Sequence, residues 1–254
     1  MPISKLLALA VLTCATTLAH AEDKKYTLAD LKSLVDEKHY LEAITHMSDI
    51  APSERKTEWK DLLGMAATGF AQSGKEPIDK LRNMLAIEEQ FPTVVKNAKY
   101  AAVRTEWGPK GFDKCFQDSY DVSECRSFAI KFIDDDASNG KLALAMAKVA
   151  RRGMNAYNST PLFKRAVAAT KKTACKDDDL ELSAIAALGL PTDNDDYADG
   201  KSVVNSCFAE LKPAIVKELE KGETGYFKDN ACALLTSKGD KAVAKLCAKS
   251  KKDD

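Results

Sequence analysis

The sequence predicts an all-α fold in which antiparallel helical hairpins form a solenoid-like or bundled right-handed array. Apolar residues recur at helical spacing along most of the chain, and no segment sustains the alternation typical of a strand. Short polar breaks join the periodic segments, so consecutive helices should be antiparallel neighbours. Six prolines fall between the periodic segments, at or near expected helix starts, where the missing amide hydrogen costs little: Pro52, Pro77, Pro92, Pro109, Pro161 and Pro191.

The first 21 residues have the layout of a secretory signal peptide. Lys5 precedes the apolar run 6–12, which is too short to span a bilayer, and Ala19-His20-Ala21 has the small-x-small pattern of a cleavage site. We expect cleavage between Ala21 and Glu22, which would deliver the protein to the bacterial periplasm or the exterior.

Cys14 raises one alternative, a lipid anchor attached within the leader. Thr13 is a poor match to the small residue that precedes an acylated cysteine, and the leader continues beyond this point. Cleavage after Ala21 is therefore favoured over lipid attachment at Cys14.

Helix-start signals define the first three helices. Thr27 and Asp30 form a capping pair, and a polar break at 37–39 separates the first helix from the second. Ser53 caps the third, which closes at Ser73-Gly74. The expected helices cover 27–35, 40–50 and 53–73.

The remaining chain contains ten further periodic segments. Pro109 is expected to end one helix, and Pro213 to kink or end another. Asp177-Asp178-Asp179 suits a helix N-terminus, where the helix dipole favours negative charge. The segments cover 78–85, 94–102, 112–116, 122–133, 142–150, 163–170, 180–188, 203–219, 227–235 and 243–247.

The longest polar interruption, 191–200, is interpreted as an acidic loop. The expected organisation is then a signal peptide over 1–21, a helical-repeat-like domain over 22–190, this loop, and C-terminal helical hairpins over 201–254 that pack on the same domain.

The segment 28–52 resembles a tetratricopeptide-like helical hairpin. That family turns at a polar pair and then places an aromatic residue and, three positions later, a small residue where two helices cross; Tyr40 and Ala43 match these positions, and Ile44 and Met47 match the apolar ones that follow. Pro52 comes earlier than the family's proline, and no second copy follows at a period in the thirties. The resemblance implies a helical-repeat-like architecture, whose members mostly bind other proteins.

Six cysteines remain after the leader, an even number that indicates disulfides in an oxidising compartment. Cys232 and Cys247 lie at similar distances on either side of Gly239, so an antiparallel hairpin would bring them to the same height. Cys115 and Cys125 flank a turn in the same way, which leaves Cys175 for Cys207. We expect pairs 115–125, 175–207 and 232–247, which would staple the C-terminal half; no Cys-x-x-Cys motif suggests zinc or redox chemistry.

The chain offers few residues for catalysis. It carries 38 basic and 38 acidic residues, a balance that does not predict nucleic-acid binding. After the leader only His39 and His46 remain, with Glu42 near them, and no phosphate-binding glycine loop occurs. The acidic runs 134–136 and 193–200 fit no calcium-loop register and are interpreted as solvated loops and caps. We therefore assign no catalytic, cofactor-binding or metal-binding residue.

The expected function is a non-enzymatic scaffold or protein-binding module of the periplasm or cell envelope. Its partner would be another envelope protein, and no transmembrane segment is predicted. The alternative is a hydrolase of an envelope polymer that uses paired carboxylates, such as Glu88 and Glu89 or Asp134 to Asp136. A purely structural envelope component would have the same sequence features as a binding module.

Overall fold

The computed structural model describes residues 25–118, 122–239 and 246–247. The predicted leader, its cleavage site at Ala21 and Glu22, and Cys14 lie outside the described residues. Within the described residues the fold is all-α, with twelve α-helices and no strand, so the predicted fold class is confirmed. None of these helices combines the length and the apolar character that crossing a bilayer requires.

Short 3₁₀ segments connect several of the α-helices: η1 (Met47–Asp49), η2 (Pro52–Glu54), η3 (Pro92–Lys96) and η4 (Ala156–Ser159). The α-helices are α2 (Leu28–Asp36), α3 (Tyr40–His46), α4 (Thr57–Ser73), α5 (Pro77–Gln90), α6 (Ala98–Asp118), α7 (Val122–Asp134), α8 (Gly140–Gly153), α9 (Thr160–Ala174), α10 (Asp178–Leu188), α11 (Asp195–Ser206), α12 (Phe208–Glu220) and α13 (Tyr226–Ser237).

The described chain forms two compact units. Unit 1 consists of residues 25–74 and 83–103, and unit 2 consists of the remaining described residues. The divisions therefore fall within α5 and α6 and between α4 and α5, whereas the sequence analysis placed its boundaries at the two ends of 191–200.

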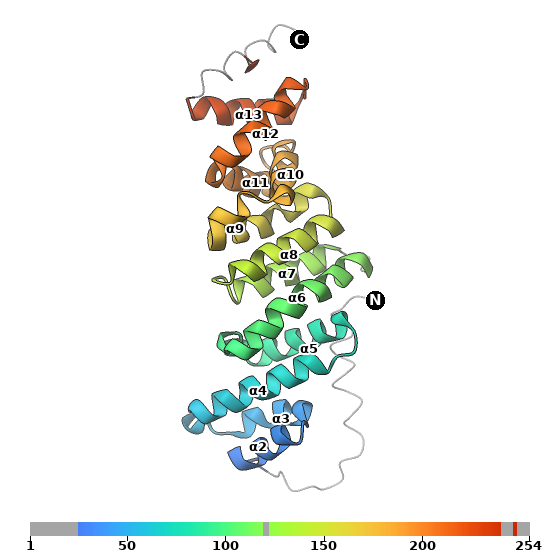
Figure 1. Ribbon diagram of the computed structural model, residues 1–254, viewed down its shortest axis with the longest axis vertical. Helices are drawn as coiled ribbons and strands as arrows, with labels where there is room; N and C mark the ends of the chain where they lie inside the picture. The colour runs from blue at the N-terminus through green and yellow to red at the C-terminus, as the bar shows by residue number, and fades with distance from the viewer. Residues whose placement is uncertain (1–24, 119–121, 240–245, 248–254) are drawn as a thin grey trace. The chain divides into compact units, whose positions relative to one another are not determined.

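In unit 1, α2 packs against α3 and α4, and α3 packs against α4 (Figure 1). The capping pair at the start of α2 is confirmed: the Asp30 amide donates to Thr27 Oγ1, and the Thr27 amide donates to Asp30 Oδ2. Small and apolar side chains fill the space between the helices, and the most buried of them are Leu31, Ala43, Met47, Ala66, Ala67, Met84 and Tyr100.

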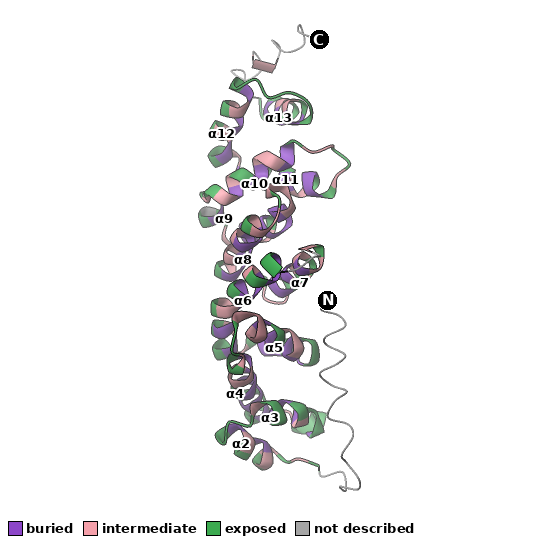
Figure 2. Ribbon diagram, turned by 90° about the vertical axis from the view of Figure 1, so that its right-hand side faces the viewer, coloured by how far each residue is buried: buried purple, intermediate pink, exposed green. Residues whose placement is uncertain are grey.

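In unit 2, most helices pack against the next helix and the next but one along the chain. α8 packs on α7 and α9, α9 packs on α11, and α10 packs on α11, α12 and α13. This pattern is what successive hairpins produce when they stack on one another. Figure 2 shows that these helices carry both buried and exposed residues, as amphipathic helices should. The largest buried side chains include Phe112, Phe132, Ile133, Leu142 and Phe163.

Three disulfides lie in unit 2, and their pairs are those that the sequence analysis expected. Cys115–Cys125 links α6 to α7, with 6.0 Å between the Cα atoms. Cys175–Cys207 links the end of α9 to the end of α11 (Cα–Cα 5.2 Å), and Cys232–Cys247 links α13 to residue 247 (Cα–Cα 5.8 Å). Two of the three lie in the C-terminal half. Each disulfide should stabilise the folded protein by about 2–4 kcal/mol, because it restricts the unfolded chain.

The expected helix end at Pro109 is wrong. Pro109 lies inside α6, which continues to Asp118 and so absorbs the separate helix predicted over 112–116. Close packing on the flanking glycines fixes this segment: a Cβ at Gly108 would lie 2.6 Å from the Phe132 ring, and one at Gly111 would lie 2.5 Å from Leu81 Cβ. Tertiary contacts thus outweigh the backbone hydrogen bond that proline removes.

Pro213 was expected to kink or end a helix; α12 does not end there but continues to Glu220, and the break between helices lies earlier, at Cys207 between α11 and α12. The expected cap of the third helix at Ser53 is also wrong, because Ser53 lies in η2 and α4 begins at Thr57.

The expected acidic loop over 191–200 is shorter than predicted, because α11 begins at Asp195. The side chain of Asn194 accepts a hydrogen bond from the Asp196 amide and so caps the helix. Asp195 and Asp196 then occupy the first turn, where negative charge is favourable. Asp177 caps α10 in the same way, as predicted.

Candidate functional site

The turn between α2 and α3 places polar residues at the surface of unit 1. α2 ends at Asp36, and the chain reverses through Lys38, whose φ of 66° lies in the left-handed region. The amide of His39 then donates to the Leu34 carbonyl at 2.8 Å. The turn therefore holds Lys38 and His39 at the surface, where both side chains are exposed.

Tyr40 packs against α4 because position 69 is a glycine. A Cβ at Gly69 would lie 2.5 Å from Cδ2 of the Tyr40 ring, so only glycine permits this approach. With Tyr40 fixed against α4, the next residue, Leu41, projects outward and is 60% exposed. Phe70 follows Gly69 and is half-buried.

These residues line an open groove of about 520 Å³. We call it the α3–α4 groove. Its apolar part comes from Leu41, Phe70 and Tyr40, and its volume lies within the range of about 300–1,000 Å³ typical of ligand pockets. All its lining residues belong to unit 1: Lys38, His39, Tyr40, Leu41, Glu42, Phe70 and Ser73.

Glu42 lines the groove and is hydrogen-bonded to Tyr26, which is not a lining residue. The Tyr26 hydroxyl donates to Glu42 Oε1 at 3.0 Å, and the Tyr26 ring stacks on His46 with 3.8 Å between the ring centroids. The hydrogen bond to the Glu42 carboxylate is the largest cause that raises the pKa of Tyr26 above its ordinary value. His46 Nδ1 lies 2.8 Å from Asp49 Oδ2, which orients the imidazole beneath the tyrosine ring.

The two histidines do not share a site. His39 lies in the exposed turn, with its Nδ1 4.0 Å from Glu37 Oε2. His46 instead stacks against Tyr26 and pairs with Asp49. Among the residues that the structure describes, no group of three or more histidine, cysteine, aspartate or glutamate side chains is arranged to hold a metal ion.

The adjacent carboxylates Glu88 and Glu89 lie in different environments. Glu88 is 3% exposed, and its Oε1 accepts a hydrogen bond from the Tyr100 hydroxyl at 2.9 Å. Glu89 is exposed. The pair therefore does not present two carboxylates to one substrate position, as the hydrolase alternative would require.

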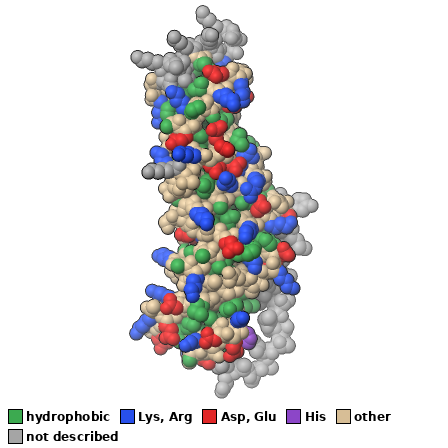
Figure 3. Space-filling view, viewed as in Figure 1, with side chains coloured by type: hydrophobic (Ala, Val, Ile, Leu, Met, Phe, Trp, Pro, Cys, Tyr) green, Lys and Arg blue, Asp and Glu red, His purple; other side chains and the backbone are tan. Residues whose placement is uncertain are grey.

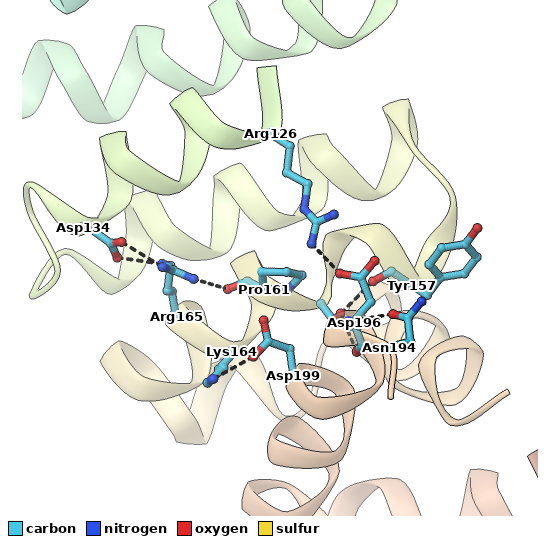
Figure 4. Close-up of polar contacts among 10 residues, drawn as sticks. Arg126, Asp134, Tyr157, Pro161, Lys164, Arg165, Asn194, Asp196 and Asp199 are labelled. Carbon is cyan, nitrogen blue, oxygen red and sulfur yellow. Dashed lines mark hydrogen bonds and ion pairs between the residues drawn. The ribbon is translucent and has the colours of Figure 1, made fainter. Parts of the chain in front are cut away.

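The acidic run 134–136 forms ion pairs and hydrogen bonds. Arg165 donates to both oxygens of Asp134, at 2.6 and 2.8 Å (Figure 4). Asp135 pairs with Lys131 at 2.6 Å. Asp136 accepts from Asn139 Nδ2 at 2.9 Å and lies 3.8 Å from Arg104 Nη1. Asp134 therefore links α7 to α9 and Asp136 lies near Arg104 of α6, whereas Asp135 pairs with a residue of its own helix.

The acidic residues of α11 also make contacts between helices. Asp199 pairs with Lys164 of α9 at 2.7 Å, and Asp196 pairs with Arg126 of α7. Figure 4 shows the Arg126 side chain extending to Asp196. Burial raises the pKa of Asp196, while the Arg126 guanidinium opposes the shift.

Arg104 and Phe132 form a buried contact that the sequence analysis did not identify. Arg104 is fully buried, its Nη2 donates to the Phe132 carbonyl, and its guanidinium carbon lies 3.7 Å from the centroid of the Phe132 ring. Sequence analysis also gave Tyr26 no role, and it placed Phe70 on the apolar face of the third helix but not in a groove. No local signal identifies them, because their partners are set by how helices cross.

On the face shown in Figure 3, basic and acidic side chains are interspersed, in keeping with the balanced charge of the sequence. The chain has no significant match to a family model, to a curated protein or to a solved structure.

Proposed function

We propose that this chain is an exported, non-enzymatic binding protein of the bacterial periplasm or cell envelope. The α3–α4 groove would receive a segment of a partner protein. The proposal of export is supported by the leader-like sequence of residues 1–21 and by three disulfides, which persist in oxidising compartments.

The observation that carries the proposed binding role is the exposure of Leu41. A leucine 60% exposed beside the half-buried Phe70 keeps apolar surface in water at the mouth of a groove. Covering that surface would release the ordered water around it and favour association.

The chemistry of the groove supports a peptide segment as its occupant. The apolar part suits one large aliphatic or aromatic side chain, while Lys38 and Glu42 provide charges of both signs at the rim. The partner segment would therefore carry an apolar anchor flanked by polar residues of mixed charge.

The contacts of the carboxylates favour a structural role for these side chains over a catalytic one. Asp134, Asp196 and Asp199 each pair with a basic side chain of another helix, and Glu88 is buried against Tyr100. We therefore propose a binding protein rather than an envelope-polymer hydrolase.

A photo-crosslinking amino acid at position 41 tests the groove. It should yield one defined adduct in cells, and the same group at Leu182, a leucine 49% exposed on α10 in unit 2, serves as the matched control. The adducted protein, once identified and purified, should bind Leu41→Glu at least about tenfold more weakly than the unmodified chain. Leu182→Glu should bind normally. Equal binding by both variants, or no adduct at 41, would contradict the proposed site.

The intact mass of the exported protein tests the proposed location separately. A chain in the envelope fraction that begins at Glu22 is the expected result, and retention of the leader in the cytosol would refute export.

A further inference from the structure

The three disulfides differ in their access to solvent. In the first two pairs all four cysteines are at most 4% exposed: Cys115, Cys125, Cys175 and Cys207. Cys232 and Cys247, by contrast, are both partly exposed. Because thiol–disulfide exchange requires direct attack on a sulfur atom, the partial exposure of both residues favours attack at the pair 232–247 over the two buried pairs.

The two buried disulfides lie in packed surroundings. Cys115 belongs to α6 together with the buried Phe112 and Phe116, and Cys175–Cys207 lies where α9 and α11 end. Reaching either bond would require local unfolding of these helices, which lowers the rate of attack.

α13 does not depend on its disulfide for attachment to the rest of unit 2. Asn230 is 6% exposed, and its Nδ2 donates to the carbonyls of Leu188 and Leu190 at 2.9 and 3.0 Å. The side chains of Phe227, Leu234 and Leu235 are buried as well. Opening the bond would therefore leave α13 in place.

We propose that Cys232–Cys247 is a thiol-exchange site, at which a dithiol reductant converts the disulfide to two accessible cysteine thiols while the other two disulfides stay intact. One thiolate of the reagent attacks one sulfur of the pair, the S–S bond breaks, and the other cysteine leaves as a thiolate. The second thiol of the reagent then attacks the reagent's own sulfur in this mixed disulfide, which closes the reagent's disulfide and releases the remaining protein cysteine as a thiolate. The protein gains two electrons and two protons, and the reagent is oxidised to its own disulfide.

The consequence is a protein with two stable covalent states. In the oxidised state the pair is closed. In the reduced state Cys232 and Cys247 are available for mixed disulfides with another thiol compound, whereas the four buried cysteines are not.

Graded reduction tests the assignment. The folded full-length protein is exposed briefly to dithiothreitol, alkylated with N-ethylmaleimide, and mapped by mass spectrometry. Cys232 and Cys247 should be alkylated at a rate at least about tenfold greater than the other four cysteines. Earlier opening of either buried pair, or reduction of all three at one rate, would overturn the proposal.

A double variant, Cys232→Ser with Cys247→Ser, provides the second measurement. It should retain the helical circular dichroism signal and the two slow reductions, and it should lack the fast phase. Persistence of a fast phase in this variant would overturn the assignment, and so would loss of the helical signal, because α13 would then depend on the bond.

Discussion

The ring of Tyr40 on α3 packs directly against Gly69 of α4, where a Cβ would lie 2.5 Å from the ring carbon Cδ2. This approach joins the predicted helical hairpin to the following helix. It also places Leu41 outside the core, at the α3–α4 groove.

Gly69→Ala should destabilise unit 1 by about 1–3 kcal/mol, because the new methyl group overlaps the Tyr40 ring. The loss should appear although alanine favours a helix over glycine by about 1 kcal/mol. Urea unfolding followed by circular dichroism measures the change. In a Tyr40→Ala background the same substitution should be neutral or stabilising, and an equal loss in both backgrounds would contradict the contact.

Glu42→Gln should lower the pKa of Tyr26 toward its ordinary value, because the hydrogen bond to a carboxylate is the largest cause of its upward shift. Since the folded pKa is raised, this contact stabilises the fold below the ordinary pKa of tyrosine, and its contribution is lost as pH rises through the raised value. Tyrosine-labelled NMR across alkaline pH resolves the residue. An unchanged titration in Glu42→Gln would show that Glu42 is not the cause; Ser33→Ala, at an exposed position that contacts Glu37, is the control.

Arg126→Met should destabilise the protein by about 1–3 kcal/mol at pH 7, because it leaves the Asp196 carboxylate, only 10% exposed, without its cationic partner. Burial raises the pKa of Asp196, so the folded state favours the neutral form of this side chain more than the unfolded chain does. Stability from that form is fully present below the ordinary carboxyl pKa and is lost as pH rises through the raised value.

The penalty of Arg126→Met should therefore shrink as the pH is lowered, which urea unfolding at a series of pH values can follow. Lys131→Met removes an ion pair whose lysine is 63% exposed, and it should cost less than about 0.5 kcal/mol at every pH. A pH-independent penalty at Arg126 would contradict the assignment to Asp196.

Arg104→Lys should destabilise unit 2 by about 2–4 kcal/mol even though it conserves charge. Lysine has no planar guanidinium to lie over Phe132 while it donates to the backbone carbonyl of the same residue. Thermal unfolding measures the loss. Arg152→Lys, at an exposed pair with Asp113, should change little, and similar effects at the two positions would argue against the Phe132 contact.

Local chemistry predicted the helices and several of their ends. Thr27 and Asp177 cap helices as expected, because side-chain capping depends on residues only two or three positions away. Nearest-neighbour disulfides followed from the heights of cysteines on successive hairpins.

Features that depend on tertiary packing escaped the same reasoning. Pro109 lies within α6 because close packing at Gly108 and Gly111 outweighs the cost of one missing hydrogen bond, and Pro213 lies within α12. The α3–α4 groove was also invisible, since Gly69 and Phe70 acquire their meaning only where α4 meets Tyr40. The acidic runs were expected to be solvated, yet Asp196 pairs with Arg126 of another helix. The sequence could not predict this pair, because the two residues are 70 positions apart and leave no local signal.

The order of the disulfides bears on how the chain acquires them. Each cysteine bonds to the next one along the described sequence, and no bond spans another. If the leader with Cys14 is removed as proposed, the second cysteine of each pair would emerge when only its partner is unpaired, so oxidation in order of emergence would yield this connectivity. Such a chain needs an oxidant during its biogenesis but little reshuffling of wrong bonds afterwards.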